Sequence, residues 1–146
     1  MQVVVGSDEK TVLTDVVTEE LRRRGHEVTL TGPLAGRDMA WSAVGREVGE
    51  TVASGAADAG VLFCWTGTGA SIAANKVPGV RAALCADAVT AEGARRYNDA
   101  NVLVMSLRST SPAVATEMLE AWFSAEPDAD ERDNIAALEA EGRGIH

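Results

Sequence analysis

One stretch near the middle of the chain restricts the fold more than any other. Residues 59–64 (AGVLFC) form a continuous apolar run, which is typical of a strand buried on both faces of a parallel sheet. A glycine-interrupted turn over residues 65–69 follows directly, and the small residues after it predict the start of a helix. A strand, a glycine-rich loop and a helix N-terminus in this order direct several backbone N–H groups at one point. Such an arrangement holds an anion, or an oxygen that becomes anionic during a reaction.

Strand and helix patterns alternate along the rest of the chain. Strands are expected at residues 2–6, 27–31, 59–64, 80–85 and 101–106. The first expected helix begins at the capping residues Ser7-Asp8 and stops at Arg24-Gly25. The second has Trp41, Val44, Val48 and Val52 on its inner face, and a short third helix follows the glycine-rich loop. Three more helices are expected over about 89–97, around 114–122 and over about 131–141. This alternation predicts an α/β protein, a three-layer Rossmann-like fold with a five-stranded parallel sheet and helices on both faces.

The carboxyl-terminal part differs in character from the rest. We expect one α/β domain over residues 1–125, followed by an acidic linker and a helical tail over residues 126–146. The last helix has only Ile135 and Leu138 as large apolar residues, too few to pack well alone. It is therefore expected to lie against a neighbouring subunit, so that the protein is a homo-oligomer.

Composition narrows the class of protein. The chain has 146 residues, 46% hydrophobic and 24% charged, which suits one soluble domain with a sizeable core. A formal net charge of −9 argues against a nucleic-acid-binding surface. The sequence has no CxxC, no HExxH and no apolar stretch long enough to span a membrane, and Met1 leads directly into a strand. We therefore expect no metal site, no membrane span and a cytoplasmic location.

Right-handed crossovers place the carboxyl end of every strand on one edge of the sheet, where ligands bind in open α/β folds. Cys64 ends the central strand at this edge. A free cysteine is most often a small buried hydrophobe, but beside backbone N–H groups its thiolate is stabilised and can act as base or nucleophile. Both readings stay open for Cys64. Cys85 also ends a strand, but no loop motif follows it, and a core position is the favoured reading.

The other candidates at this edge also have two readings. Residues 66–69 (TGTG) form either a tight strand-to-helix turn or a ligand loop, and they match neither a dinucleotide fingerprint nor a P-loop. Asp8 is either a helix cap or a ligand contact, and Arg108 either a surface cation or an anion contact. Asn98 and Asp99 are either turn formers or part of the site.

Histidine contributes little to the expected site. His26 precedes the second strand at the amino edge of the sheet, and His146 is the last residue, so neither is expected to reach the carboxyl edge. General acid–base chemistry then depends on Cys64, Asp8, Glu9, a tyrosine or water.

At these residues the chain resembles the ribose-5-phosphate isomerase B and galactose-6-phosphate isomerase family. The resemblance covers nearly the whole length, and its central segment is long and specific. The matching segments are Gly6-x-Asp8, Cys64-x-Thr66-Gly67-x-Gly69-x-Ser71-Ile72-Ala73-Ala74-Asn75-Lys76, Val80-Arg81-Ala82, Asn98-Asp99-x-Asn101-Val102-Leu103 and Arg108. The resemblance implies a five-stranded parallel sheet, a homodimer or dimer of dimers, active sites completed by a neighbouring subunit, and neither a metal nor an organic cofactor.

The resemblance also implies roles for particular residues. A cysteine matched by Cys64 removes a proton from the carbon next to the carbonyl, and the glycine-rich loop stabilises the resulting enediolate. Thr66 is matched to a threonine that positions or protonates a substrate oxygen. The resemblance also implies a set of substrate-binding positions. They are Asp8, Glu9, Gly67, Thr68, Gly69, Ser71, Tyr97, Asn98, Arg108 and Arg132. At two of them, Glu9 and Tyr97, the residue differs from the one usual in the family.

Four departures from the family pattern bear on the substrate. Glu9 stands where the family usually has histidine, and Tyr97 where it has the ring-opening histidine. Trp65 replaces the usual glycine after the catalytic cysteine, where it narrows or lines the pocket. Residues 128–133 (DADERD) replace a basic phosphate-binding cluster, and only Arg132 among them is basic. The isomerase core is retained, while the ring-opening residue and much of the phosphate-binding set are changed.

The leading hypothesis is an aldose–ketose isomerase acting on a sugar phosphate or a related sugar derivative. The substituted histidine positions also leave open a catalytically silent sugar-binding or assembly subunit of the same family. A third hypothesis is ribose-5-phosphate isomerase activity that persists despite the substitutions.

Overall fold

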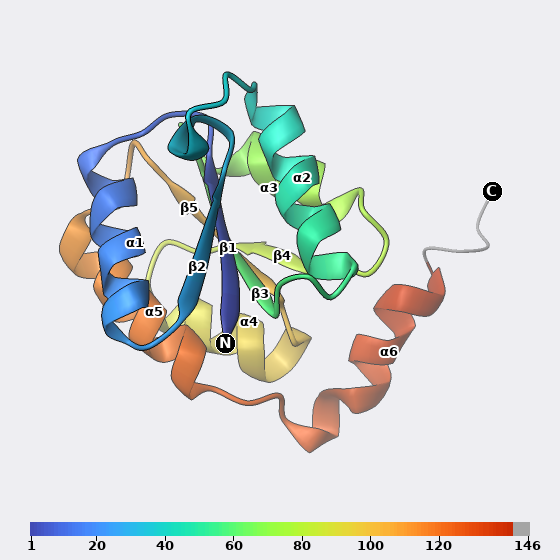
Figure 1. The fold of residues 1–146 in the computed structure, drawn as a ribbon. Helices are drawn as coiled ribbons and strands as arrows, with labels where there is room; N and C mark the ends of the chain where they lie inside the picture. Colours follow the sequence, from blue (N-terminus) through green and yellow to red (C-terminus); the bar gives the residue numbers. More distant parts are fainter. Residues whose placement is uncertain (142–146) are drawn as a thin grey trace.

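The computed structural model describes residues 1–141 and has three layers, with a central sheet between two layers of helices (Figure 1). The strands are β1 (Gln2–Ser7), β2 (Glu27–Thr31), β3 (Ala59–Cys64), β4 (Ala82–Leu84) and β5 (Val102–Ser106). The helices are α1 (Val12–Arg23), α2 (Trp41–Ala53), α3 (Thr68–Asn75), α4 (Ala88–Asn98), α5 (Pro112–Ser124) and α6 (Arg132–Glu141), with 3₁₀ turns at Gly32–Ala35 and Ala129–Glu131. The predicted fold class is confirmed.

All five strands are parallel, in the order β2-β1-β3-β5-β4. From β1 the chain moves outward to β2, and from β3 it continues on the other side of the sheet. The carboxyl ends of β1 and β3 therefore flank the point where the strand order reverses. In open parallel sheets the crevice at this point is the usual ligand site.

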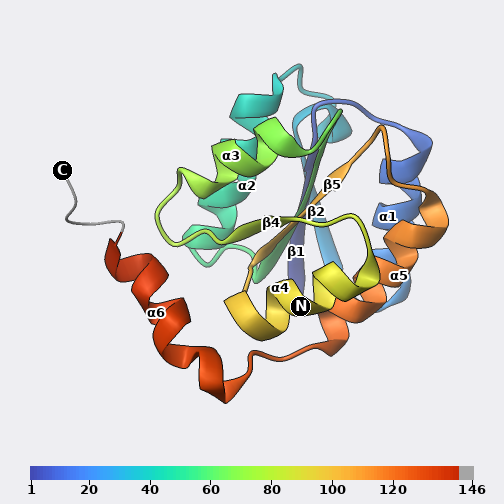
Figure 2. The same ribbon diagram turned by 180° about the vertical axis from the view of Figure 1, so that it is seen from behind.

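The two faces of the sheet carry separate cores because alternate strand residues point in opposite directions. On one face Val5, Phe63 and Met105 pack under α1, α4 and α5. On the other face Leu62 and Val104 pack under α2 and α3, and Cys64 belongs to this second core. Figures 1 and 2 show α1 and α5 on one side of the sheet and α2 and α3 on the other.

The prediction that α1 begins at Ser7-Asp8 is wrong. The helix begins after Thr11, whose side chain accepts a hydrogen bond from the N–H of Thr14 while the Thr14 hydroxyl accepts one from the N–H of Thr11. This reciprocal pair satisfies two of the unpaired donors at the helix start. Asp8 therefore lies in the loop between β1 and α1 and is not used as a cap.

Two other expectations differ from the structure. The fourth strand spans only Ala82–Leu84, at one edge of the sheet, where it pairs with β5. Trp41 does not lie on the buried face of α2 with Val44 and Val48, and it is 47% exposed. As the first residue of the helix it lies above the carboxyl edge of the sheet, beyond the reach of the core.

Helix α6 stands apart from the three layers (Figures 1 and 2). An ion pair at 2.6 Å between Arg81 and Glu139 connects it to the start of β4, and Leu138 is half exposed. The linker before it is held to α4 by Asp128, whose carboxylate accepts from the Arg96 guanidinium. Packing of α6 on a second subunit remains a prediction, as does the division of the chain at residue 125. Within residues 1–141, no helix is long and apolar enough to cross a membrane.

Helix α3, which follows the glycine-rich loop, is held by an unusually close approach of α2. A Cβ atom built on Gly45 would lie 2.8 Å from the Cβ of Ala73 and 2.9 Å from the backbone oxygen of Ala70. Backbone at that distance cannot be displaced without moving the helix. The small residues Gly45 and Ala73 therefore allow α2 and α3 to pack this closely, which sets the position of α3 above the sheet.

We predict that Gly45→Ala destabilises the protein relative to a matched helical control, Gly93→Ala. Both substitutions gain about 1 kcal/mol of helix propensity. The Cβ at position 93 would contact only ring atoms of Tyr97 at 3.3 Å. Overpacking at position 45 should cost about 1–3 kcal/mol more. Urea unfolding midpoints of the two variants measure the difference, and equal midpoints would contradict the close-approach account.

Candidate active site

A cleft of about 280 Å³ opens at the reversal point of the strand order, at the carboxyl ends of β1 and β3. Its lining residues come from the β1–α1 loop, the start of α2, the end of β3 and the glycine-rich loop. They are Asp8, Trp41, Cys64, Trp65, Thr66, Thr68 and Gly69. Five of the seven are residues that the sequence predicts for substrate binding or catalysis, one is Trp65, and the seventh is Trp41.

Cys64 lies at the floor of this cleft with 5% of its surface exposed. Its Sγ accepts a hydrogen bond from the backbone N–H of Ala70, with 3.4 Å between nitrogen and sulfur. Ala70 lies in the first turn of α3, so the helix N-terminus also faces the sulfur. An N–H dipole and a helix N-terminus are therefore both directed at the sulfur.

The glycine-rich loop turns sharply at Gly67, where φ is +83°. A Cβ atom there would lie 2.5 Å from Leu84 Cδ1 and 3.3 Å from the backbone of Met105, so both conformation and space require glycine. This turn brings the start of α3 back over the end of β3.

The loop presents polar groups to the cleft. Within residues 1–141, the N–H groups of Thr68 and Gly69 have no intramolecular acceptor, as expected for the first residues of a helix. The hydroxyls of Thr66 and Thr68 are 2.8 Å apart and hydrogen-bonded to each other. Backbone donors and hydroxyls at this point suit an oxygen that gains negative charge.

Asp8 lines the same cleft as Cys64, and its Oδ1 is a buried oxygen without a hydrogen-bond partner in the described chain. Burial raises the pKa of this carboxyl above 3.8, with a smaller contribution from the nearby charge of Glu9, while a backbone hydrogen bond acts in the opposite direction. Ser7 shapes the loop by donating to the carbonyl of Glu9 at 2.6 Å. An unpartnered carboxyl oxygen in a cleft is an acceptor available to a ligand hydroxyl.

Two indoles flank the cleft. Trp65 is 58% exposed, and its backbone oxygen accepts from the N–H of Arg108 at 2.9 Å and from the Ser106 hydroxyl at 3.0 Å. The ring of Trp41 lies against Gly69, where an added Cβ would come within 2.8 Å of it. The sequence does not predict Trp41 as a site residue, because helical periodicity groups it with the core valines of α2.

Several predicted site residues lie outside the cleft of a single chain. The backbone N–H of Arg108 donates to the carbonyl of Trp65, and its side chain is exposed in the loop after β5. Ser71 is on α3, where its N–H donates to Gly67, and Glu9 is exposed beside Asp8. Their roles as ligand contacts remain predictions.

Tyr97, Asn98 and Arg132 are grouped elsewhere. Asn98 lines a groove of about 800 Å³ that also includes residues 75–83 and Leu138 of α6. Tyr97 is half exposed, with the Arg96 guanidinium 5.3 Å from its ring centre, and Arg132 is exposed at the start of α6. One chain therefore does not bring these three residues to Cys64.

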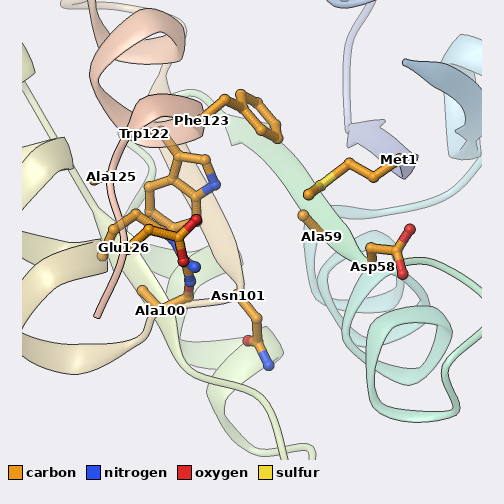
Figure 3. A pocket seen from close by; sticks show the side chains of 10 residues that line it. Met1, Asp58, Ala59, Ala100, Asn101, Trp122, Phe123, Ala125 and Glu126 are labelled. Atoms are coloured by element: carbon orange, nitrogen blue, oxygen red, sulfur yellow. The ribbon is translucent and has the colours of Figure 1, made fainter. Parts of the chain in front are cut away.

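A smaller hollow of about 90 Å³ lies at the opposite, amino edge of the sheet (Figure 3). Figure 3 shows Trp122 and Phe123 on one side of it and Met1 and Asp58 on the other. Two of its polar side chains have partners: Asn101 accepts from the N–H of Arg81 at 2.7 Å, and Asp58 accepts from the N–H of Gln2 at 2.8 Å. Among the described residues, the buried side-chain oxygen without a partner is Asp8 Oδ1, at the carboxyl edge.

Two residues that the sequence placed outside the site lie where expected. His26 is at the amino edge, 3.2 Å from the terminal amine, and burial lowers its pKa together with the positive charges of that amine and Arg24. Cys85 is in the core, where burial, with the charge of Asp87, raises its pKa to about 11. The prediction for His146 falls outside the described residues. No group of three or more His, Cys, Asp or Glu side chains within residues 1–141 is placed to hold a metal ion.

The fold and the cleft define a class: a small parallel α/β protein with a thiol, backbone donors and a carboxyl facing one cavity at the switch point. Comparison with known proteins gives the family. The chain matches the family profile described as Ribose/Galactose Isomerase over residues 3–137, and it belongs to that family. The family resemblance inferred from the sequence is thereby confirmed.

Named relatives agree with this assignment. The chain is 33% identical over 128 residues to D-erythrulose-4-phosphate isomerase of Pectobacterium atrosepticum, covering 86% of this chain and 84% of that protein. It is 35% identical over 115 residues to ribose-5-phosphate isomerase B of Escherichia coli, and the match covers 79% of this chain and 77% of that protein. A match of 46% identity to the putative sugar phosphate isomerase YwlF of Bacillus subtilis spans 54% of this chain and about half, 53%, of that protein.

Solved structures show the same fold. The ribose-5-phosphate isomerase B of Clostridium thermocellum superposes with a TM-score of 0.89 at 33% identity over 97% of both chains. The type B ribose 5-phosphate isomerase of Trypanosoma brucei superposes with a TM-score of 0.88 at 34% identity, over 96% of this chain and 97% of that chain. The chain thus has the fold of an aldose–ketose isomerase family along its length.

We predict that Asp8→Asn raises the thermal stability of the protein at pH 7. Because the pKa of Asp8 is raised in the folded state, the unfolded chain releases this proton more readily, so ionisation favours unfolding above the folded-state pKa. The stabilising effect of the substitution should disappear as the pH falls below about 3.8, where both states hold the proton. Thermal unfolding between pH 3 and pH 7 measures it. The exposed Glu117→Gln serves as control, and a pH-independent gain would rule out this explanation.

Proposed function

We propose that the protein is an aldose–ketose isomerase that acts on a sugar phosphate, or a related sugar derivative, through an enediolate, with Cys64 as the base. The observation that carries this proposal is the placement of the Cys64 sulfur at the floor of a cleft, hydrogen-bonded to the N–H of Ala70. A base in the site of an isomerase must reach a C–H bond while a neighbouring oxygen gains charge. The thiol and the loop donors provide both functions within one short segment.

The proton transfers balance as follows. The Cys64 thiolate takes the proton from C2 of the aldose, and the electron pair of that bond forms the C1–C2 double bond as the C1 carbonyl becomes an enediolate oxygen. A proton moves from the oxygen on C2 to the oxygen on C1. The Cys64 thiol then returns its proton to C1, and the carbonyl is left on C2. No atom is gained or lost.

Neighbouring residues supply the charge stabilisation and the positioning. The N–H groups of Thr68 and Gly69 at the start of α3 stabilise the enediolate oxygen, a contribution that in related oxyanion sites reaches about 3–4 kcal/mol for one donor. Thr66, whose hydroxyl is bonded to that of Thr68, positions an oxygen for protonation. Asp8 accepts a sugar hydroxyl at its unpartnered oxygen, and Arg108 contacts the phosphate.

The names of the relatives support a phosphorylated sugar as the substrate. They include isomerases of ribose 5-phosphate and of D-erythrulose 4-phosphate, and galactose-6-phosphate isomerase subunit LacB of Clostridium acetobutylicum, which is 35% identical over 128 residues. These substrates range from four to six carbons, so the family name does not fix the chain length. Each reaction exchanges an aldose for a ketose at C1 and C2.

We further propose that each active site is completed by a second copy of the chain. Tyr97, Asn98 and Arg132 correspond to substrate contacts of the family, yet in one chain they lie around α4 and α6, away from Cys64. Helix α6 has a half-exposed Leu138, and a wide groove lies beside it. A homo-oligomer in which these residues reach the neighbour's cleft explains both the placement and the exposed apolar surface.

We predict that Cys64→Ala lowers kcat about 10²–10⁴-fold, because a positioned general base contributes that much to proton transfer. Cys85→Ala is the matched control: it removes the other thiol, which is buried with a pKa of about 11, and should leave kcat close to wild type. Steady-state isomerisation of sugar phosphates measures both variants. Activity of Cys64→Ala within a few-fold of wild type would exclude the thiol as the base.

We predict that two inactive variants restore activity when they are combined. Cys64→Ala lacks the base and Asn98→Ala lacks a contact that we assign to the other subunit. In a mixed dimer one of the two sites has both residues intact. Co-expression with two different affinity tags, followed by purification of the mixed species, should recover up to half of the wild-type rate per dimer. If each site lies within one chain, the mixed species stays inactive.

A further inference from the structure

The two hydroxyls of the glycine-rich loop bond to each other and not to the helix beside them. Thr66 Oγ1 and Thr68 Oγ1 are 2.8 Å apart, and within residues 1–141 each has the other as its hydrogen-bond partner. Thr66 precedes Gly67, the N-cap of α3, and Thr68 is the first residue of that helix, yet α3 has no side-chain cap. Helices α1, α4 and α5 all begin with one. The hydroxyls at α3 therefore do not have the capping role that is usual for threonine at a helix start.

Both threonines are exposed and line the cleft that contains Cys64. Thr68 offers this cleft two groups: its hydroxyl, and its backbone N–H, which has no intramolecular acceptor within residues 1–141. Because both groups belong to one residue, an oxygen bound at the N–H has the hydroxyl as a near neighbour. The oxygen that gains charge at the loop donors is therefore also close to the hydroxyl pair.

A pair of hydroxyls bonded to each other has one free donor and one free acceptor. Each hydroxyl has one proton and two lone pairs. One of the two protons lies in the bond between Thr66 and Thr68, so the hydroxyl that accepts this bond can donate its own proton outward. The hydroxyl that donates the bond keeps lone pairs free to accept. The pair therefore suits a ligand that loses a proton at one oxygen and gains a proton at the next.

The isomerisation proposed above contains such a step, the transfer of a proton from the oxygen on C2 to the oxygen on C1. A direct transfer is bent, because it closes a five-membered ring, and hydrogen bonds weaken steeply below about 120°. The two oxygens of a cis-enediolate are about one hydrogen-bond length apart, which matches the spacing of the hydroxyls of Thr66 and Thr68. Two hydroxyls can thus face two oxygens, with a nearly straight hydrogen bond at each transfer.

We propose that Thr68 is a further catalytic residue, which forms with Thr66 a proton relay between the two oxygens of the enediolate. This inference rests on the proposed isomerase function and adds the carrier of the oxygen-to-oxygen proton transfer. The hydroxyl next to the C2 oxygen takes its proton and passes its own proton to the second hydroxyl, which passes its proton to the C1 oxygen. Each threonine ends with one proton, and the negative charge moves from the C1 oxygen to the C2 oxygen.

The test separates the C–H step from the transfer between oxygens. The wild-type protein is first assayed with D-ribose 5-phosphate, D-erythrose 4-phosphate and D-galactose 6-phosphate, and the sugar that it isomerises fastest is then used in deuterium oxide. NMR follows the ketose formed and the deuterium that enters C2 of the remaining aldose. An enediolate that keeps the proton on its C2 oxygen can return only to the aldose. A broken relay therefore allows exchange at C2 and slows ketose formation.

Thr68→Val removes the hydroxyl with little change of shape and keeps the backbone N–H. It should lower kcat about 10–100-fold and raise the ratio of C2 exchange to ketose formation about 10-fold or more, since a positioned proton transfer contributes about 10²-fold or more. Thr68→Ser keeps a hydroxyl and should recover most of the lost rate. The double variant Thr66→Val/Thr68→Val should be no slower than Thr66→Val, because the loss of either member breaks the relay.

The outcomes separate the relay from the function on which it rests. If the wild-type protein isomerises none of the three sugars, the proposed function itself fails. If Thr68→Val isomerises at the wild-type rate, or loses exchange and isomerisation equally, the relay is overturned and the isomerase function stands. The relay is also overturned if Thr68→Ser is as slow as Thr68→Val, or if the losses of the two single variants multiply in the double variant.

Discussion

The hydrogen bond from the Ala70 N–H to the Cys64 sulfur links the end of β3 to the first turn of α3, and the rest of the site depends on it. It requires that the chain reverse within a few residues, which only the positive φ of Gly67 permits at this packing distance. It also requires that α3 stay close to the sheet, which the small residues between α2 and α3 provide. A buried thiol, unpaired backbone donors and an unpartnered carboxyl then meet at one cavity.

The position of that cavity follows from topology. Because the strand order reverses between β1 and β3, the connections that leave these two strands diverge, and residues that follow their carboxyl ends line the same cleft. Asp8 follows β1 and Cys64 ends β3. The same parallel register that builds the core therefore brings together two residues that are 56 positions apart. Both are held by local bonds, Asp8 by the Ser7 turn and Cys64 by Ala70.

Much of this arrangement is readable in the sequence, and the reasons for the failures are specific. The apolar run, the glycine-rich loop and the alternating pattern predict the sheet, the switch-point edge and the loop over Cys64. Periodicity fails at Trp41, because the first residue of a helix can satisfy the spacing of the buried face and still lie beyond the core. Local capping preferences fail at Ser7 and Asp8, because Thr11 and Thr14 form the better cap. Tyr97 and Asn98 lie on α4, apart from the Cys64 cleft of one chain, and no intrachain pattern tests the site roles expected of them.

The central claim is that the sulfur of Cys64 moves a proton between two carbons through an enediolate. The most direct measurement follows an aldose phosphate deuterated at C2 during turnover in ordinary water, by proton and deuterium NMR. The account predicts that deuterium appears in the solvent at a rate comparable to isomerisation, since a thiol facing an open cleft exchanges its proton with water. Complete transfer of deuterium from C2 to C1, with none released to the solvent, would indicate a direct hydride shift and contradict the account.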